Sequence, residues 1–457
     1  MHKKDKTMSE EKIIVGLDIG TTKVACIVGR RAENKKIEIL GYGKTVSTGV
    51  RRGVVTNILE TVEAIKKAVK QASDQSGVDI QRVSVGIAGQ HIKSLQHRGV
   101  MMRDNHETEI TEAELEQLRE DTRKINMMPG EEIIDIIPQD IYVDGELANN
   151  PVGMLGSKIE ANFHVIIGQT LAAKNIVKCI QNAGLEMDYM ILEPIASAQA
   201  VLDEEEKDAG VVLVDIGGGT TDIAIFKENK IQHTAVIPFG GNIITEDICT
   251  GCSIIKHYAE EVKVKFGSAL ADENREDEVV SIPGIKGRPP KEISFKNLAG
   301  IIQSRLEEIF ELVNIEIQKA RSDNKLIAGI VLTGGGAMMK HINMLAEFNT
   351  GMEVRIGHPD EHLTKGKFKE MASPMYSTGI GLVIETLYRM EHDEQLRASQ
   401  EAIRAQRAAA MAVPTQPVEI ETPVDDEPVD EPKTGKGGIG VRIITRLSEI
   451  FKPDDIK

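Results

Sequence analysis

The chain has 457 residues, 41% of them apolar and 28% charged, and its 55 Lys and Arg against 71 Asp and Glu give a formal net charge of −16. This composition predicts a soluble globular protein of two or more domains, and its acidity argues against a nucleic-acid partner. The apolar runs are too short to cross a bilayer, no secretory signal opens the chain, and the four cysteines, including Cys249 and Cys252 in CxxC spacing, are interpreted as ordinary thiols of a cytoplasmic protein.

The first predicted element is a strand–turn–strand pattern that recurs later in the chain. An apolar run ends at Asp18 before one Gly and two Thr, and a second run ends at Asp215 before three Gly and two Thr. Glycines let backbone N–H groups approach phosphate oxygens, and the Asp can hold Mg²⁺, so we expect the two turns to face each other around a polyphosphate. For either copy alone, an ordinary glycine turn is the alternative. The expected Mg²⁺ ligands are Asp18 and Asp215, and the expected phosphate-binding residues are Asp18, Gly20, Thr21, Thr22, Lys23, Gly217, Gly218, Gly219, Thr220 and Thr221.

The segments between and after the two copies alternate between helix and strand patterns. Apolar residues at helical spacing predict helices at 57–73 and 175–183, and apolar runs predict strands at 83–88, 163–167 and 328–332. This alternation is typical of an α/β fold, and the repeated hairpin indicates a duplication into two similar lobes.

Two stretches interrupt the alternation. An acidic helix expected at 107–126 marks an inserted subdomain at about 84–160. A helix expected at 257–266 and a Gly- and Pro-rich loop at 282–290 mark a second insertion at 227–304. We therefore expect one inserted subdomain in each lobe.

A third glycine cluster follows the strand expected at 328–332. Gly334, Gly335 and Gly336 precede a helix expected at 338–347, and such a turn lets a flat base or ribose lie close to the backbone. The three turns together resemble those of the actin, heat-shock chaperone and sugar-kinase superfamily. The resemblance implies an actin-like duplicated ATPase fold that holds ATP and Mg²⁺ between its lobes.

Further site residues follow from this resemblance. Glu260 and Lys263 match the helix that contacts adenosine, although two charges three residues apart also suit an exposed ion pair. Glu193 resembles the residue that positions the attacking water, so the resemblance implies Glu193 and Asp215 as catalytic residues. The alternative for Glu193 is a carboxylate that stabilises the start of a helix.

Longer stretches of about residues 12–390 resemble the FtsA family of bacterial cell-division proteins. This resemblance implies an ATP-binding actin homologue, with at most weak hydrolysis, that polymerises on the cytoplasmic face of the membrane at the septum. It also implies that the protein anchors filaments of FtsZ, through Arg305 and Glu308, and recruits later division proteins. For Arg305 and Glu308 a solvated charged helix face is the alternative. The stretches are 47–58, 86–94, 150–160, 215–222 and 373–381.

The family resemblance and the pattern of insertions together predict a division of the chain. The expected parts are a first core subdomain at 12–83 and 161–200, a family-specific insert at 84–160, a second core subdomain at 201–226 and 305–390, an insert contacting adenosine and FtsZ at 227–304, a flexible acidic Pro-rich linker at 391–438, and an amphipathic membrane-binding helix at 439–452.

The C-terminal region combines an acidic segment with a basic one. Residues 414–432 hold seven acids and no base, whereas 433–457 hold six bases and three acids. A helix at 439–452 would be amphipathic, which suits a membrane interface with anionic lipid headgroups. Docking on the protein's own body or on a partner is the alternative. The residues expected at the membrane are Ile439, Arg442, Ile443, Ile444, Arg446, Leu447, Ile450, Phe451 and Lys452.

Two other functions are compatible with the same motifs, because a fold does not fix a function. One is an enzyme, either a small-molecule kinase or a chaperone ATPase. The other is a structural filament of the rod-shape type, which the stretch at 150–160 disfavours.

Overall fold

The structure is a computed structural model that describes residues 12–34, 36–284, 287–320, 326–364 and 366–411. Contacts divide the chain into two units, Met1–Arg404 and Ala405–Lys457. The described part of the second unit ends at Met411 and continues the last helix of the first. The segment 412–438 and the helix expected at 439–452 lie outside the described residues.

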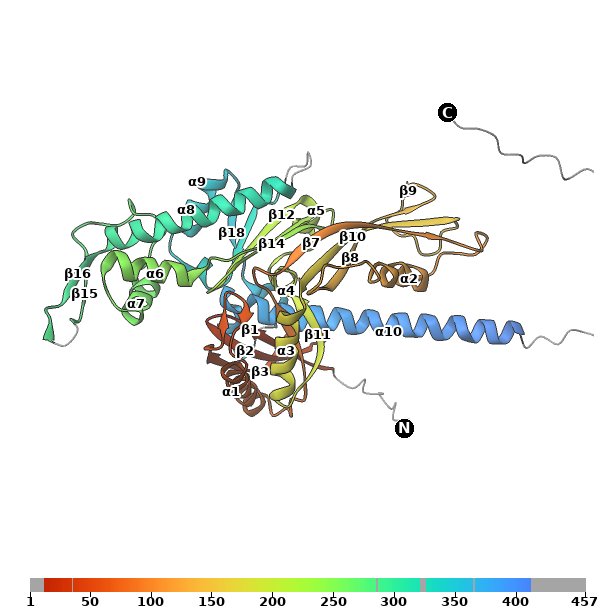
Figure 1. Cartoon of the computed structure of the whole chain (residues 1–457), viewed down its shortest axis with the longest axis horizontal. Helices are drawn as coiled ribbons and strands as arrows, with labels where there is room; N and C mark the ends of the chain where they lie inside the picture. Colours follow the sequence, from red (N-terminus) through yellow and green to blue (C-terminus); the bar gives the residue numbers. More distant parts are fainter. Residues whose placement is uncertain (1–11, 35, 285–286, 321–325, 365, 412–457) are drawn as a thin grey trace, which may run out of the picture. The chain divides into compact units, whose positions relative to one another are not determined.

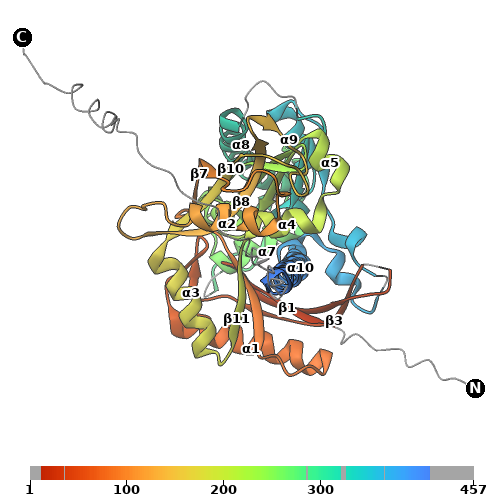
Figure 2. The same ribbon diagram turned by 90° about the vertical axis from the view of Figure 1, so that its right-hand side faces the viewer.

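The first lobe is a five-stranded sheet with two helices on one face. Its elements are β1 (Ile13–Ile19), β2 (Lys23–Arg31), β3 (Ile37–Val46), β6 (Arg82–Ile87), β11 (Glu186–Leu192), α1 (Ile58–Ser76) and α3 (Thr170–Asn182). The strand order is β11-β6-β1-β2-β3, with β1 antiparallel to β2 and parallel to β6. Figure 1 labels β1, β2, β3 and β11 of this sheet. Helices α1 and α3 pack on the outer face of this sheet (Figure 2).

Capping residues set the ends of α1, which the sequence predicts at 57–73. The Asn57 side chain accepts a hydrogen bond from the Glu60 backbone N–H and so begins the helix. Gly77, with φ +71°, ends it in the left-handed conformation. The prediction is confirmed, with three further residues at the C-terminal end.

The second lobe repeats the sheet of the first. Its strands are β12 (Val211–Ile216), β13 (Thr221–Lys227), β14 (Lys230–Ile237), β17 (Ile330–Thr333) and β18 (Val354–Ile356). They follow the order β14-β13-β12-β17-β18, with β12 antiparallel to β13 and parallel to β17. The duplicated α/β fold predicted from the sequence is confirmed, and the two hairpins hold equivalent places.

Two helices, α4 (Glu193–Val201) and α10 (Ser377–Met411), contribute to a core that both sheets share. Alternate residues of a strand face opposite sides, so Leu213 packs into this shared core while Val212 packs among the helices of the second lobe. Ile14 of the first sheet packs into the same shared core.

Helix α10 also contacts the first inserted subdomain and the first sheet. The Arg389 guanidinium lies 2.6 Å from an oxygen of Asp135, and the Tyr189 hydroxyl donates to Asp393 at 2.5 Å. Residues 391–411 are helical, so the expected linker is wrong for that part of 391–438. The Ala-, Glu-, Gln- and Arg-rich sequence there has a high helix propensity.

The first inserted subdomain is a four-stranded sheet with one helix. Its elements are β7 (Lys93–Met102), β8 (Glu131–Val143), β9 (Glu146–Leu147), β10 (Lys158–Gln169) and α2 (Glu112–Thr122), and the strand order is β7-β10-β8-β9. The border expected at residue 84 cuts through β6, which pairs with β1 in the core sheet. Helix α2 is shorter than the predicted 107–126 because Thr111 and Glu114 form a capping box that begins it.

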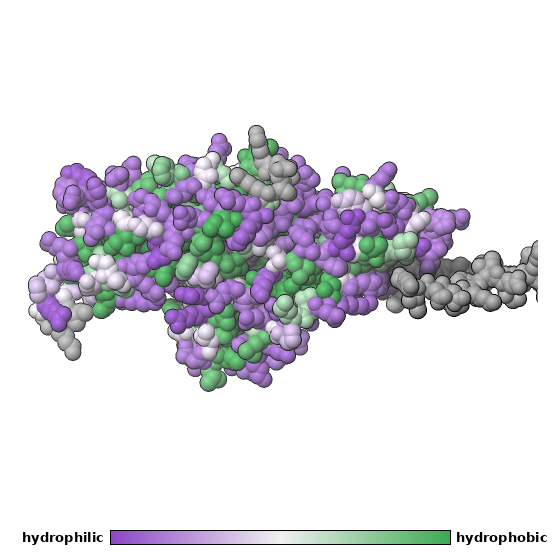
Figure 3. All heavy atoms as spheres, turned by 45° about the horizontal axis from the view of Figure 1, so that its top comes forward, coloured by the Kyte–Doolittle hydropathy of each residue, from purple (hydrophilic) through white to green (hydrophobic). Residues whose placement is uncertain are grey.

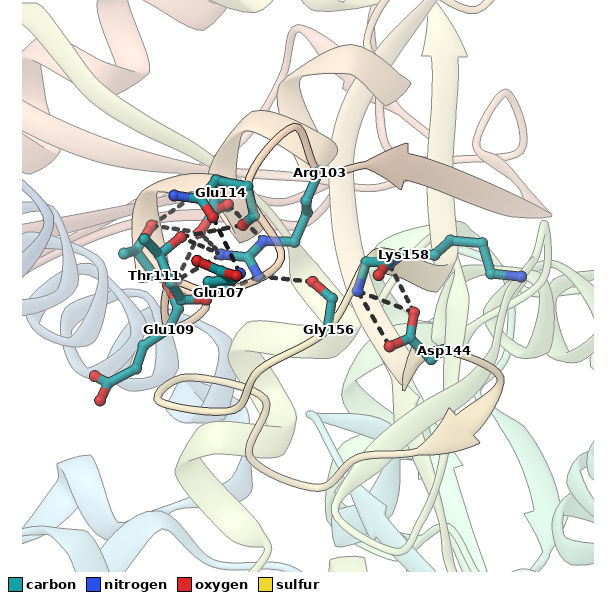
Figure 4. A network of polar contacts seen from close by, with 11 residues as sticks. Arg103, Glu107, Glu109, Thr111, Glu114, Asp144, Gly156 and Lys158 are labelled. Atoms are coloured by element: carbon teal, nitrogen blue, oxygen red, sulfur yellow. Dashed lines mark hydrogen bonds and ion pairs between the residues drawn. The ribbon is translucent and has the colours of Figure 1, made fainter.

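Arg103 joins the start of α2 to the stretch 150–160 in this subdomain (Figure 4). Its side chain is only 2% exposed, and its guanidinium donates to the Glu114 carboxylate at 2.8 Å and to the Gly156 carbonyl at 2.8 Å. A third bond reaches the Thr108 carbonyl at 3.0 Å. One buried cation thus fixes two loops that β-strand pairing does not hold.

The second inserted subdomain begins and ends later than expected. Its elements are α6 (Gly241–Cys252), α7 (Lys256–Phe266), β15 (Val279–Ile282), β16 (Lys291–Ser294) and α8 (Phe295–Ala320). Strand β14 belongs to the core sheet, so the border expected at 227 falls in the β13–β14 hairpin. Helix α8 continues through the border expected at 304 because its buried stripe, from Leu298 to Ile317, is uninterrupted.

The other regular elements are short. They are β4 (Val50–Arg51), β5 (Val54–Val55), α5 (Glu204–Ala209) and α9 (Ile342–Thr350). Hydrophobic side chains lie in small groups among hydrophilic ones on the face drawn in Figure 3. Among the described residues, no helix combines the length and apolar character needed to span a bilayer.

Candidate nucleotide-binding site

A cleft of about 680 Å³ lies where the two repeated hairpins meet, which is a common size for a small-molecule site. Nearly all residues expected to bind phosphate or Mg²⁺ line it. Thr221 is the exception: its hydroxyl donates to the Phe239 carbonyl at 2.8 Å. The prediction for Thr221 is wrong because neighbouring residues of a strand face opposite sides. The expected residues that line the cleft are Asp18, Gly20, Thr21, Thr22, Lys23, Asp215, Gly217, Gly218, Gly219 and Thr220.

The two turns approach each other so closely that only glycine fits in the second. A Cβ atom on Gly218 would lie 1.7 Å from the hydroxyl oxygen of Thr22, and one on Gly219 would lie 2.4 Å from that of Thr21. Glycine permits this approach because it has no side chain. The turns therefore face each other, as the sequence predicts.

Asp215 lies between the second hairpin and the two helices of the shared core. It is only 7% exposed, and its carboxylate accepts hydrogen bonds from Ser197 of α4 at 2.7 Å and Thr378 of α10 at 3.1 Å. Burial raises the pKa of Asp215, while these two hydrogen bonds oppose the rise. The carboxylate thus has a fixed orientation at the end of β12.

Three further carboxylates crowd around Asp215. Burial, followed by the charge of Asp215, raises the pKa of Asp222 to about 8, and one Asp222 oxygen is buried without a hydrogen-bond partner. The Lys23 ammonium lies 2.5 Å from Asp18 and balances one of these charges. The centre of the cleft therefore carries a surplus of buried carboxyl groups, some of which keep their protons at neutral pH when no cation is bound.

This surplus fits a bound divalent cation. The described residues contain no cage of three or more His, Cys, Asp or Glu ligands. Mg²⁺ does not need such a cage, since it keeps several waters and binds through one or two carboxylates and substrate phosphates. Asp18 and Asp215 supply two carboxylates beside the two Gly- and Thr-containing turns that are expected to bind phosphate (the phosphate-type turns). The residues present therefore fit the ion.

Glu193 is the first residue of α4 and lines the same cleft. A Cβ atom on Gly86 of β6 would lie 2.8 Å from the Glu193 side chain, which shows how tightly Glu193 packs on the sheet. Burial, and then the charges of Asp18, Asp222 and Asp215, raise the pKa of Glu193 well above its usual value. A cation at Asp18 and Asp215 would lower that pKa and leave Glu193 able to accept a proton from water.

Glu260 and Lys263 belong to α7, and both line the cleft. Lys263 is buried, and its ammonium donates to Glu260 at 2.7 Å, to the Gly241 carbonyl at 2.8 Å and to Thr245 at 2.9 Å. The pair is therefore not simply an exposed surface ion pair, because Lys263 also fixes the start of α6.

The third glycine cluster also lies at the cleft. Gly334 has φ +85°, and a Cβ atom there would lie 2.2 Å from an Asp215 oxygen. Gly335 faces open space, so it leaves room for a ligand. The helix expected at 338–347 is wrong at its start: a 3₁₀ turn covers Gly336–Met338, and α9 begins only at Ile342 after His341 adopts φ +62°.

Several residues at the cleft carry no sequence signal that predicts them. Lys44 and Asn242 line it, and Ser197 and Thr378 orient Asp215. The Gly240-Gly241 pair at the start of α6 is nevertheless a usable signal, since it resembles the other glycine turns. Nothing local marks Ser197, because its role depends on a contact across the fold.

Arg305 and Glu308 lie on α8, outside the lining of the cleft. The Arg305 guanidinium binds both oxygens of Asp247 on α6, at 2.6 and 3.1 Å, and also contacts Glu308. The Arg305 side chain is 21% exposed and that of Glu308 47%, so Glu308 is the more accessible of the two.

The CxxC pair lies at the end of α6. Cys252 is buried, and this burial raises the pKa of its thiol. Cys249 is partly buried. Both are free thiols.

Comparisons with known proteins agree with this architecture. A family model described as "Cell division protein FtsA" matches residues 212–381, and one described as "SHS2 domain inserted in FTSA" matches 89–167. The second match begins after β6 and ends two residues before the end of β10, so it covers nearly all of the first inserted subdomain.

Full-length relatives extend the similarity over most of the chain. The cell division protein FtsA of Pseudomonas aeruginosa is 40% identical over 85% of this chain and 92% of its own length, and that of Escherichia coli (strain K12) is 35% identical over 82% and 90%. Among solved structures, the "PilM-PilN type IV pilus biogenesis complex" matches with a TM-score of 0.60 and 15% identity, over 82% of this chain and 98% of the other. The duplicated, two-lobed α/β architecture is the actin-like ATPase fold. From its similarity to these relatives over more than four fifths of its length, the chain belongs to the FtsA family of cell-division proteins.

Proposed function

We propose that the cleft binds ATP together with Mg²⁺. The observation that carries this proposal is the approach of Gly218 to Thr22, because it places two phosphate-type turns on one cavity. The buried surplus of carboxyl groups supports a divalent cation, which Asp18 and Asp215 would hold. Glu260, Lys263 and the turn at Gly334–Gly336 would contact adenosine.

Hydrolysis in this proposal is weak and secondary to binding. Glu193 would orient a water molecule, and Mg²⁺ would withdraw charge from the phosphates when it is bound. Nucleotide would favour one arrangement of the two lobes and so favour a polymer of identical chains, as in a cytoskeletal protein.

The proposed role is that of an adaptor in cell division. The polymer would bind anionic lipids on the cytoplasmic face of the membrane at the septum through residues 439–452, and it would hold FtsZ filaments there. FtsZ would bind near Glu308 and Arg305 on α8, and later division proteins would join this assembly. Family membership and the amphipathic pattern of 439–452 support this role.

The experiment is co-sedimentation of purified FtsZ with liposomes that contain anionic lipid. We expect FtsZ to sediment with liposomes only when the full-length chain and ATP are present. A chain that lacks residues 413–457 should still bind FtsZ in solution but leave it in the supernatant. Equal recovery of FtsZ with and without the full-length chain would refute the adaptor role.

The principal rival is a small-molecule kinase or a chaperone ATPase. Either enzyme would consume ATP faster when its substrate is added, and this activity would survive deletion of 413–457. A steady ATPase rate across a panel of metabolites and unfolded peptides therefore favours the adaptor.

A further inference from the structure

A second cavity, of about 590 Å³, lies beside the β4–β5 hairpin and outside the nucleotide cleft. Its lining comes from this hairpin, from the turn after β6 and from the end of β10. Most of the lining is polar, and none of the described residues that form it is acidic. The residues used below are Arg51, Arg52, Gln90, His91 and Gln169.

The two arginines of this cavity make no ion pair with the other described residues. Arg52 and Gly53 have φ +49° and +74°, so they form the centre of a tight hairpin turn that prefers Asn or Gly at the position of Arg52. A positively charged residue thus stands at the cavity in a conformation that it adopts reluctantly. Two guanidinium groups without a carboxylate partner favour an anionic ligand.

His91 supplies a second and independent sign of a ligand. Only 7% of it is exposed, yet neither ring nitrogen has a hydrogen-bond partner. Burial lowers the pKa of His91, so the neutral ring offers one N–H donor at neutral pH. A buried donor without an acceptor is costly, and a ligand oxygen in this cavity would satisfy it.

The N-terminus of α3 is the third feature at this cavity. Gln169 is both a lining residue and the N-cap of this 13-residue helix, and no side chain caps the helix. Its first turn contains no acidic residue. The Thr170 N–H donates to the Gly130 carbonyl at 2.9 Å, so the other N–H groups of the first turn and the positive end of the helix dipole are what remain for an external anion.

We propose that this cavity is a binding site for a phosphate-type oxyanion, held by Arg51, Arg52 and His91 at the N-terminus of α3. It is separate from the phosphate-type turns of the nucleotide cleft. The two sites are close, since the Gly53 backbone N–H donates to the Thr21 hydroxyl at 3.0 Å. The test must therefore distinguish them.

The test is equilibrium dialysis of the full-length protein against radiolabelled inorganic phosphate at constant ionic strength. The nucleotide cleft is first filled with Mg²⁺ and a non-hydrolysable ATP analogue. We expect one phosphate to bind per chain. The double variant Arg51→Gln/Arg52→Asn should weaken this binding at least tenfold, and Asn suits the positive φ at position 52.

A matched control removes the same charge elsewhere. Arg82→Gln/Arg123→Gln takes away two exposed arginines whose partners lie outside the cavity, namely Asp188 and Glu120. This variant should bind phosphate like the unmodified protein. Single variants Arg51→Gln and His91→Gln, each checked for native circular dichroism, should give intermediate losses.

Other outcomes overturn the site. No bound phosphate in the unmodified protein would refute it, and so would equal binding by the Arg51→Gln/Arg52→Asn variant. Phosphate that binds only while the nucleotide analogue is absent, and that the arginine variants do not affect, would belong to the nucleotide cleft. Because the variants themselves locate the bound anion, this result does not depend on the ATP proposal.

Discussion

At the scale of single residues, Asp215 is buried and accepts hydrogen bonds from the hydroxyls of Ser197 and Thr378. Asp215→Asn should remove the charge that Mg²⁺ requires and keep an oxygen for Ser197 and Thr378. We expect ATP–Mg²⁺ affinity, measured by calorimetry, to fall at least tenfold, about 1.4 kcal/mol. Asp272→Asn changes a fully accessible carboxylate and should bind ATP normally. Unchanged affinity of the Asp215 variant would contradict the proposed metal site.

His164 makes the stability of the folded protein depend on pH, whether or not nucleotide is bound. Its ring nitrogens lie 3.0 Å from the Thr234 hydroxyl and 3.4 Å from the Gln96 side chain, and burial followed by the charge of His233 lowers its pKa to about 4. Between pH 6.5 and 4 the unfolded chain binds a proton that the folded chain does not bind. Stability from this group therefore falls as the pH falls through that window.

The variant His164→Gln isolates this effect because glutamine does not titrate. The free energy of unfolding of the unmodified protein, minus that of the variant, should become smaller by about 1 to 3 kcal/mol between pH 7 and 4.5. Urea denaturation at each pH measures it. A difference that stays constant between pH 7 and 4.5 for His164→Gln would refute the assignment.

At the scale of elements, the two hairpins depend on their glycine turns. Gly218→Ala places a methyl group against Thr22 and should push the hairpins apart, so we expect nucleotide affinity to fall at least tenfold, about 1.4 kcal/mol. Adding Thr22→Ala removes the clashing hydroxyl and should restore part of that loss. Calorimetric titration of the single and double variants measures both effects.

Gly300→Ala is the control for this pair. A Cβ atom there meets nothing within 4 Å and lies in helix α8, so the change should leave nucleotide binding intact and slightly stabilise the helix. If Thr22→Ala gave no recovery in the Gly218 variant, the contact between the hairpins would not be the cause of the loss.

The hairpins could be predicted from the sequence because their signals are local. An apolar run, an Asp and a glycine turn stand within a dozen residues, so the sequence predicts Asp18 and Asp215 together with their turns. The carboxylate environment could not be predicted. Ser197 and Thr378 reach Asp215 from two other elements, 18 and 163 residues away in the chain, and a hydrogen bond between separate elements leaves no periodic pattern.

The borders of the inserted subdomains show the same limit. Strands β6 and β14 lie at the edges of the inserted subdomains. The apolar pattern of their residues does not indicate which sheet each strand joins. Pairing decides that question, since β6 pairs with β1 and β14 with β13. The residue type of Thr221 suits the phosphate site, but the alternation of the strand turns its side chain toward Phe239.

At the scale of the whole molecule, charge is unevenly distributed along the chain. The net charge is −16, but residues 433–457 contain six bases and three acids. An acidic body is repelled by anionic lipid, whereas a basic amphipathic segment is attracted to it. The net charge alone would hide this contrast, on which the proposed membrane binding rests.

The double variant Leu447→Asp/Phe451→Asp tests the membrane segment. Both residues lie on the apolar face of the expected helix, so the added charges should release the full-length protein from anionic liposomes in a flotation assay. We expect at least a tenfold loss of bound protein. Thr445→Asp/Ser448→Asp adds the same charge away from that apolar face and should weaken flotation less. Equal flotation of all three proteins would rule out the amphipathic anchor.

Helix α10 has a mechanical consequence for the first unit. Its first turn holds Thr378 against Asp215, and Arg389, three turns later, binds Asp135 of the inserted subdomain. An α-helix rises 1.5 Å per residue, so these contacts stand about 16 Å apart on one rigid rod. A displacement of Asp215 that moves Thr378 must also move the anchor point of the inserted subdomain. Helix α10 thus connects the nucleotide cleft directly to the first inserted subdomain.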